Sequence, residues 1–301
     1  MKTDIKVFKV NGKYKIMIVP GGGMFGYISN HFLAQIEADL SPVCAYGGAS
    51  IGGILSLAYA CGETPKDLDT GFHTMGNEIF QYHFWRRISP WGAKYASGDL
   101  KKQVENVVTG KYGDLKNIVI VPVLNFKKMK CKVYDNIVMH DDIDLDAWEI
   151  GVATASAPTY FDPWKVYIDG GLLENMPIMT TVTALKDKLD IPYSEMDVLV
   201  VGNGSYRRED VDMGDVSRWT GLDWLSPMIK ILTKANEMMS HKYAQNLGLN
   251  YYKKFDPVIL EPNWDMDDPS LINVMAEKCK DHISEFKNVY DEFIGGNVSN
   301  G

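Results

Sequence analysis

Long apolar runs are missing from this chain of 301 residues. No stretch of about 18 apolar residues occurs, so we expect no helix that spans a membrane. The start, MKTDIKVFKVNGKYK, has no apolar segment long enough for a secretory signal. We therefore expect a protein that works in the cytoplasm, with peripheral membrane contact left open, or one exported by a route that the sequence does not show.

Cysteine is also scarce, and no CxxC pair or metal-like Cys/His cluster is present. The four cysteines are widely spaced, at Cys44, Cys61, Cys131 and Cys279. Two of them lie in or at the end of apolar runs, so buried free thiols in a reducing compartment are the expectation, although spacing alone does not exclude pairing. We expect neither a metal nor another cofactor.

Positive charge is in deficit, with 31 Lys and Arg against 39 Asp and Glu and a net charge of -8. Non-specific binding to nucleic acid needs a basic footprint, which this balance does not supply. The same charge balance gives no general attraction to an anionic membrane, though a local basic patch could still supply one. The 46% of hydrophobic and 23% of charged residues are typical of a globular protein, and the length is ample for a buried core.

Apolar runs alternate with helical patterns along the chain, and no internal repeat interrupts them. Buried strands are predicted at 15–20, 43–46, 117–124 and 197–202, and helices at 27–39, 50–61, 225–249 and 269–293. This alternation favours a mostly parallel sheet covered on both faces, whose sites gather at the carboxyl ends of the strands. We expect one domain over 1–301, with a core of about 14–205 and a helical C-terminal portion of about 217–293.

A glycine-rich loop, PGGGMFG at 20–26, follows the first predicted strand and fits the GxGxxG pattern of dinucleotide-binding folds. That function needs an acidic residue at the end of the second strand, which instead ends in Tyr46-Gly47-Gly48. Asp39 is near the right count but belongs to the end of the preceding helix. Nucleotide binding is therefore disfavoured, and a strand-to-helix turn with packing value only is the plainer alternative.

A second glycine loop, Gly48-Ala49-Ser50-Ile51-Gly52, fits the pattern GxSxG between a strand and a helix. Small residues on both sides allow a strained turn that exposes Ser50 Oγ at a helix N-terminus. Ser50 as a simple N-cap is the structural alternative, but a cap would not need the surrounding glycines. The six histidines show no local triad signature, so a general base must be sought elsewhere.

That candidate is Asp169, which ends a short β-like stretch and precedes Gly170 and Gly171. Two glycines permit close backbone approach beside the carboxylate. Found alone, such a stretch is usually only a turn.

Together the three motifs resemble the patatin-like phospholipases, in the same order along the chain. They are Gly21-Gly22-Gly23 with Gly26, then Gly48 to Gly52, then Asp169-Gly170-Gly171. With the segment before Asp169 and later landmarks, the resemblance covers about 16–293. It implies a three-layer α/β/α fold with a mostly parallel central sheet, and a Ser/Asp dyad that uses no histidine.

Carried over by motif, the resemblance makes Ser50 the nucleophile and Asp169 the base that takes its proton. Backbone N–H groups would bind the oxyanion, and each such donor can be worth about 2.7–4 kcal/mol. These donors would be Gly21, Gly22, Gly23 and Ile51, with Gly26, Gly48, Gly52, Gly170 and Gly171 supporting the motifs. One departure is Phe25, which stands where the family usually carries Arg or Lys, so a positive charge that could set the head-group preference or anchor the loop is absent there.

The implied activity is a phospholipase A-type serine acyl hydrolase acting on membrane glycerophospholipids or lysophospholipids. A neutral-lipid lipase or a transacylase would use the same dyad, and a lipid-binding protein without turnover is the alternative from another class. The aromatic, arginine-containing segment 79–91 is a candidate border of the acyl entrance, with packing into the core as an equal alternative. The acidic run at 140–146 lacks EF-hand spacing and indicates a solvated turn with helix-capping acids.

Overall fold

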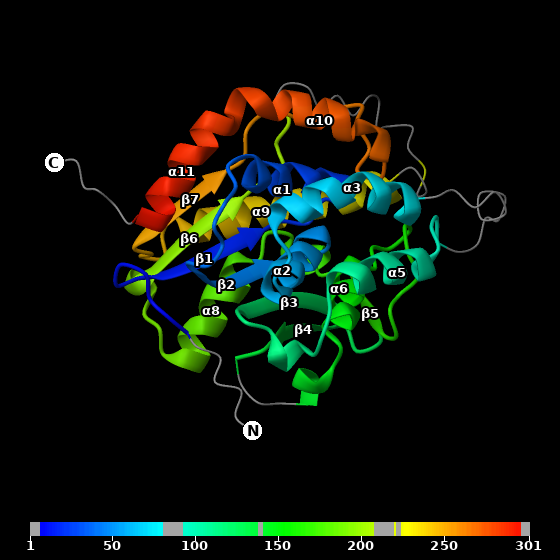
Figure 1. Ribbon diagram of the computed structural model, residues 1–301. Helices are drawn as coiled ribbons and strands as arrows, with labels where there is room; N and C mark the ends of the chain where they lie inside the picture. Colours follow the sequence, from blue (N-terminus) through cyan, green and yellow to red (C-terminus); the bar gives the residue numbers. More distant parts are fainter. Residues whose placement is uncertain (1–6, 81–92, 138–140, 208–219, 221–223, 296–301) are drawn as a thin grey trace.

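The computed structural model describes residues 7–80, 93–137, 141–207, 220 and 224–295 (Figure 1). Its strands are β1 (Tyr14–Val19), β2 (Val43–Gly48), β3 (Ile118–Asn125), β4 (Lys130–Asp135), β5 (Tyr167–Ile168), β6 (Met196–Val201) and β7 (Tyr251–Phe255). The sheet has the order β4-β3-β2-β1-β6-β7, and β5 pairs with β3. Every pair from β3 to β7 along this order is parallel, whereas β4 and β5 run antiparallel to β3. The expected mostly parallel sheet is confirmed.

Helices cover both faces of this sheet. The α-helices are α1 (Gly26–Gln35), α2 (Ile51–Cys61), α3 (Pro65–Ile79), α5 (Ser97–Val107), α6 (Ala147–Ala155), α7 (Gly171–Glu174), α8 (Ile178–Leu189), α9 (Leu225–Ala244), α10 (Ile272–Cys279) and α11 (Ile283–Gly295). Short 3₁₀ helices are η1 (Gly23–Phe25), η2 (Tyr112–Asp114), η3 (Asp141–Asp144), η4 (Tyr193–Glu195), η6 (Pro269–Leu271) and η7 (Lys280–His282).

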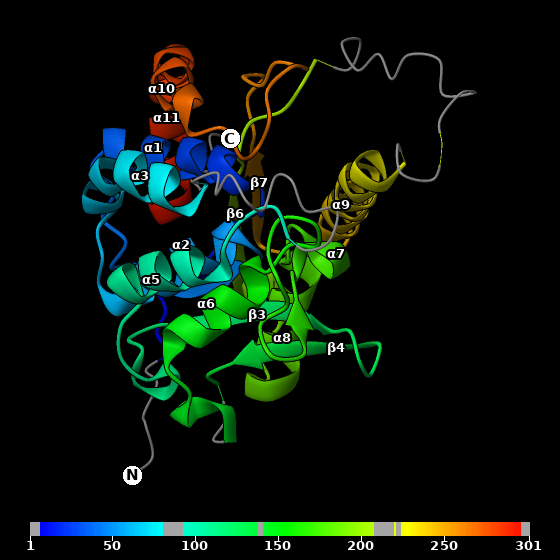
Figure 2. The same cartoon turned by 90° about the vertical axis from the view of Figure 1, so that its right-hand side faces the viewer.

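The side chains of β1 point alternately to the two faces of the sheet, and so contribute to two separate cores. Met17 and Val19 face the larger core, which contains α1, α2 and α11, while Ile16 and Ile18 face the smaller core under α8. All four side chains are fully buried, as period-2 alternation in a strand covered on both faces requires. Figure 2 shows the resulting three layers, with α8 and α9 on one side of the sheet and α2 on the other. No helix in the described ranges is long and apolar enough to cross a membrane.

The sequence-based expectations for the strands at 15–20, 43–46, 117–124 and 197–202 agree with β1, β2, β3 and β6 within a few residues. The expectation of a mainly helical C-terminal portion misses β7, which pairs in parallel with β6 at the sheet edge. Its sequence, YYKKF, is short and contains two lysines among five residues, so it lacks the apolar run of a central strand. The antiparallel strand β4 was also not expected, whereas β5 agrees with the short β-like stretch expected before Asp169.

Candidate active site

Ser50 occupies a strained turn between β2 and α2. Its φ of 53° and ψ of -130° lie outside the region that a non-glycine residue ordinarily adopts. The hydroxyl makes no cap hydrogen bond to α2, so Ser50 holds the N-cap position without acting as a side-chain cap. The turn is instead held by its backbone, because the Ser50 N–H donates to Thr154 Oγ1 at 3.1 Å. The hydroxyl therefore remains available to the cavity described below.

The glycines around Ser50 are required by close backbone approach. A Cβ added to Gly48 would lie 2.2 Å from the carbonyl oxygen of Gly52, and one added to Gly52 would lie 2.0 Å from that of Val19. The start of α2 is thus pressed against the end of β1. Gly26 does the same between helices, since its added Cβ would lie 2.6 Å from Ile51 Cγ1. These contacts explain why the pattern needs glycine where a simple cap would not.

Asp169 follows β5 and is held against β3 and the end of α6. Its N–H donates to the Ser156 carbonyl at 3.1 Å, and the Gly170 N–H donates to the Thr154 carbonyl at 3.2 Å. A Cβ on Gly170 would lie 1.9 Å from the Pro122 carbonyl oxygen, so this position accepts only glycine. The Asp169 side chain is 6% exposed. Elements that are distant in the sequence therefore place a buried carboxylate at the same end of the sheet as Ser50, where the parallel strands end.

Burial raises the pKa of Asp169 from 3.8 to about 6. Two hydrogen bonds work in the opposite direction and lower this pKa, one from the Ser50 side chain and one from the Gly171 N–H. The second measures 2.6 Å to Asp169 Oδ1. A carboxylate with a pKa near 6 is ionised at neutral pH yet basic enough to accept a proton, as a general base must.

The loop from Gly21 to Gly23 lies beside Ser50, but its three amides differ. The Gly21 N–H donates to the Asn175 carbonyl at 2.9 Å, so it is occupied. The expectation that Gly21 is an oxyanion donor does not fit this bond. Gly22, Gly23 and Ile51 line the same cavity as Ser50, and their role as oxyanion donors stays a prediction.

Two asparagines that sequence reasoning missed fix this loop. Asn175 Nδ2 and Asn203 Nδ2 each donate to the Gly21 carbonyl at 3.0 Å. Asn203 also donates to the Pro20 carbonyl at 3.0 Å, and both side chains are buried. Asn175 lies four residues after Gly171 and Asn203 lies two residues after β6, and this nearness to the motifs is the signal that the sequence carries.

The nucleotide alternative for the glycine loop is not supported by its surroundings. Asp39, the only acid near the required spacing, accepts hydrogen bonds from Ser41 N and Ser41 Oγ at 2.9 Å. Asp39 lies before the start of β2, whereas the glycine loop follows the end of β1, so the two are at opposite ends of the parallel strands. Phe25, the departure from the family pattern, is 7% exposed and packs in the larger core.

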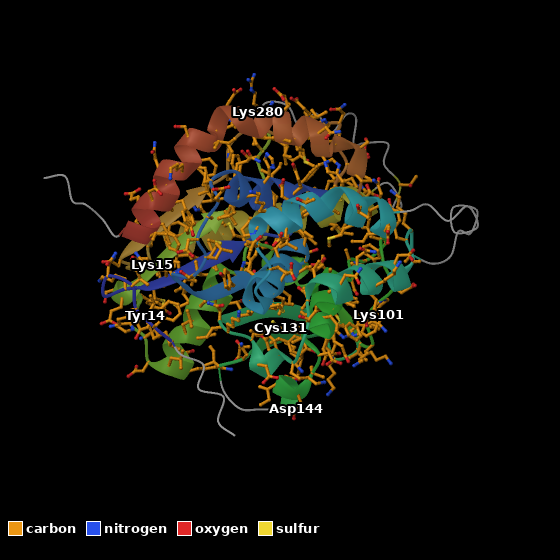
Figure 3. The ribbon with its side chains drawn as sticks, in the orientation of Figure 1. Tyr14, Lys15, Lys101, Cys131, Asp144 and Lys280 are labelled. Atoms are coloured by element: carbon orange, nitrogen blue, oxygen red, sulfur yellow. The ribbon has the colours of Figure 1, made fainter. Side chains whose placement is uncertain are left out.

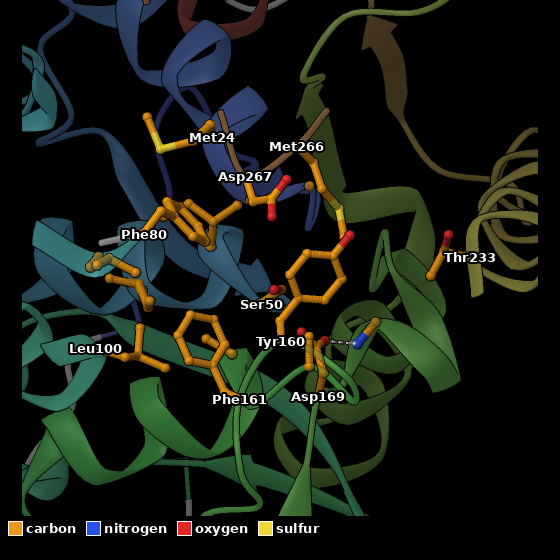
Figure 4. Close-up of a pocket in the computed structure, with 18 of the residues that line it drawn as sticks. Met24, Ser50, Phe80, Leu100, Tyr160, Phe161, Asp169, Thr233, Met266 and Asp267 are labelled. Carbon is orange, nitrogen blue, oxygen red and sulfur yellow. Dashed lines mark hydrogen bonds between the residues drawn. The ribbon is translucent and has the colours of Figure 1, made fainter. Parts of the chain in front are cut away.

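A cavity of about 130 Å³ opens over Ser50 and Asp169, and both residues lie in its wall (Figure 4). Apolar side chains make most of the remaining wall, including Met24, Ile54, Phe72, Leu100, Tyr160 and Phe161. Asp267 is the second acid in this wall, and it accepts hydrogen bonds from Lys94 and from the Tyr95 hydroxyl. The described part of the cavity wall contains no histidine. Such a cavity can hold an acyl chain with its carbonyl next to Ser50.

Two further expectations can be placed only in part. Ile79 and Phe80 of the aromatic segment line the cavity, while 81–92 lie outside the described residues. In the acidic run, Asp142 pairs with Lys132 at 2.7 Å. Asp146 stands at the N-cap of α6 but pairs with Lys111 instead of capping, so the capping expectation is wrong there. Within the described ranges, no group of three or more potential ligands could hold a metal ion, and the described cysteines are free thiols.

The chain is similar to known proteins both in sequence and among solved structures. The chain is 27% identical over 302 aligned residues to the cGAMP-activated phospholipase of Escherichia coli strain TW11681, covering 87% of this chain and 84% of that protein. It is 21% identical to patatin-like protein 4 of Arabidopsis thaliana, covering 94% and 84%. Among solved structures, VipD from Legionella pneumophila aligns with 13% identity and a TM-score of 0.48, over 92% of this chain and 67% of that one.

The model of one protein family, described as patatin-like phospholipase, matches residues 17–182. This match begins in β1, ends in α8 and contains all three glycine motifs. It spans more than half of the chain, which therefore belongs to the patatin-like phospholipase family and is a lipid acyl hydrolase.

Proposed function

We propose that this chain hydrolyses fatty-acyl esters of membrane glycerophospholipids or lysophospholipids, with Ser50 as nucleophile and Asp169 as base. The observation that carries the proposal is the meeting of these two residues in the wall of one apolar cavity. The hydrogen bond from the Ser50 side chain to Asp169 supplies the path for the proton. The raised pKa of Asp169 suits that transfer near neutral pH.

The reaction proceeds in two steps. Ser50 Oγ attacks the acyl carbonyl carbon while its proton moves to Asp169, and the carbonyl oxygen becomes an oxyanion. The N–H groups of Gly22, Gly23 and Ile51 stabilise this oxyanion, and the helix dipole of α2 adds to them. The intermediate collapses, the alcohol leaves with the proton from Asp169, and an acyl-Ser50 ester remains. Water then attacks this ester, gives a proton to Asp169 and releases the fatty acid, after which the proton returns to Ser50.

The test is release of fatty acid from mixed phospholipid vesicles, measured by mass spectrometry. Wild type is compared with Ser50→Ala and Asp169→Asn, each checked for folding by circular dichroism. Loss of a catalytic dyad member typically costs about 10³- to 10⁶-fold in rate. Because the E. coli relative is named a cGAMP-activated phospholipase, every arm is run with and without cGAMP.

The products and a labelling control separate the alternatives. Lysophospholipid and free fatty acid as products identify a phospholipase. Release of fatty acid from added diacylglycerol identifies a neutral-lipid lipase, and acyl transfer to an added lysophospholipid identifies a transacylase. A fluorophosphonate probe should label wild type and not Ser50→Ala. A folded wild type that neither labels nor releases acid in any arm contradicts the proposal and favours a lipid-binding protein.

A further inference from the structure

The helix α9 exposes apolar side chains, whereas a surface helix ordinarily buries them and exposes its polar side. Of the ten large apolar side chains that are exposed in the described ranges, six lie on α9, and each is 46% to 63% exposed. These six form what we call the outer stripe: Met228, Ile231, Leu232, Met238, Met239 and Tyr243. Their spacing of three, four and seven residues places them on one side of the helix. Figure 2 shows α9 on the outside of the molecule, next to α7.

The opposite side of α9 is polar and bonded to the catalytic loops. Asn236 Oδ1 accepts the Asn175 N–H, and Asn236 Nδ2 donates to the Gly171 carbonyl, both at 2.9 Å. Glu237 Oε1 accepts from Asn175 Nδ2 at 2.6 Å. These bonds hold α9 in a fixed position over the site. They also leave its apolar side facing solvent, and exposed apolar side chains gathered on one side of a helix mark an interaction surface.

The same helix forms part of the cavity wall. Ile229, Lys230 and Thr233 line the cavity that contains Ser50. Lys230 is itself exposed, so it lies between the cavity and the outer stripe. The cavity and the outer stripe therefore lie against two sides of the same helix.

The charge of α9 contrasts with that of the whole chain. The helix carries three lysines, Lys230, Lys234 and Lys242, against one acid, Glu237, whereas the chain has a net charge of -8. Lys234 pairs with Glu237 at 2.9 Å, and Lys230 lies 3.8 Å from Asp265 outside the helix. A basic helix with a broad apolar side fits an interface between anionic head groups and acyl chains.

We propose that the outer stripe of α9 docks the protein on an anionic phospholipid bilayer. This inference rests on the proposed function and adds the surface through which the enzyme reaches its substrate. A helix at the interface buries its apolar side about 5–10 Å deep, and an α-helix is about 10–12 Å across. The inner side of α9, and with it the cavity, then lies at the level of the head groups. A phospholipid has only to pass around α9 to bring its acyl ester to Ser50.

The test introduces charge on the stripe without touching the cavity wall. The stripe variant is Ile231→Glu/Met238→Glu, and its matched control is Met129→Glu/Val274→Glu, which adds the same charge at two exposed apolar residues on other elements. Binding is measured by flotation with vesicles of phosphatidylcholine alone or mixed with phosphatidylglycerol. Turnover is measured on the same vesicles and on the soluble ester p-nitrophenyl butyrate.

The stripe variant should lose about tenfold or more in vesicle binding and vesicle turnover, since two half-buried apolar contacts become charges. Its hydrolysis of the soluble ester should stay at the wild-type level, and the control should match wild type throughout. Vesicle binding that survives in the stripe variant overturns the inference. So does a change from dimer to monomer in sedimentation velocity with vesicle binding intact, because the stripe is then a contact between two copies.

Failure of the proposed function has a different signature. A wild type that floats with anionic vesicles but cleaves neither substrate retains the docking surface and lacks the reaction. A wild type that cleaves the soluble ester but never floats retains the reaction and lacks the docking surface.

Discussion

Two buried aspartates lie at opposite ends of the parallel strands, and their surroundings differ. Asp197, at the start of β6, is 1% exposed and accepts bonds from Lys15 Nζ at 2.7 Å and Asn250 Nδ2 at 2.6 Å. Asp169, at the other end, has hydrogen bonds from Ser50 and Gly171, and no cation in the described ranges contributes to its pKa. Figure 3 shows Lys15 at the end of the molecule near α11.

The contrast separates stabilisation from function. Lys15 is fully buried, and it also donates to the Phe293 carbonyl at 2.5 Å, so its pair with Asp197 ties α11 to β1 and β6. Removing one partner from such a pair leaves an uncompensated buried charge. Asp169 is already a buried carboxylate with no counter-ion among the described residues, and the free energy of keeping it ionised lowers the stability of the fold. A base of suitable pKa is obtained in return.

The largest effect is expected when the paired aspartate is changed. Asp197→Asn should destabilise the fold by about 3–5 kcal/mol at pH 7, because Lys15 stays buried without its counter-ion. Urea denaturation measures this. The turnover per folded molecule on the soluble ester should not change. A loss below about 1 kcal/mol, the usual worth of an exposed pair, would mean that the pair is not buried in solution.

The same substitution at the catalytic end of the strands should act with the opposite sign. Asp169→Asn removes a carboxylate whose pKa is raised from 3.8 to about 6 by folding. The raised pKa means that the folded state loses stability as pH rises from about 4 to above 6, so at pH 7 the variant should be more stable by up to about 3 kcal/mol. Below pH 4 the two proteins should have equal stability. Urea titrations at both pH values test this, and a destabilised Asp169→Asn at pH 7 contradicts the contrast.

The pH dependence of catalysis should report Asp169 alone. Its ionised form is the base, so kcat/KM should fall about tenfold per pH unit below about 6. The profile is measured on the soluble ester, which itself does not titrate in this range. Folded Asp197→Asn should give the same pH profile, since Asp197 lies at the start of β6, at the other end of the sheet from Ser50. An acid limb centred near pH 4 would show that burial does not act on Asp169 as described.

The smallest effect is expected from the support of the glycine loop. Asn175→Ala removes the hydrogen bond to the Gly21 carbonyl and one bond to α9. Misplacing the adjacent amides should lower kcat about tenfold, with less change in KM. Asn246→Ala is the matched control, because its Nδ2 donates only to the nearby Lys242 carbonyl. Equal kcat in the two variants would show that the loop holds its position without Asn175.

Much of the core was predictable because its signals are local. The apolar runs of β1, β2, β3 and β6 and the glycines around Ser50 lie within short segments, and strand burial and tight turns depend on just such segments. The edge strands β4 and β7, each with two lysines, lacked this signal. The roles of Asn175 and Asn203 were missed because each bonds to a backbone carbonyl far away in sequence.

The sequence by itself determined the order of the motifs, and with it the family, the type of reaction and the candidate pair Ser50 and Asp169. Only the tertiary structure decided that Asp169 is buried with no cation of the described part of the chain acting on it, while Asp197 shares its burial with Lys15. It also decided which side of α9 faces outward. Helical periodicity shows that apolar residues share one side and ordinarily predicts that this side is buried. In α9 the bonds of Asn236 and Glu237 to distant loops turn that side to the solvent, because burial and pairing depend on partners that the chain brings together only when it folds.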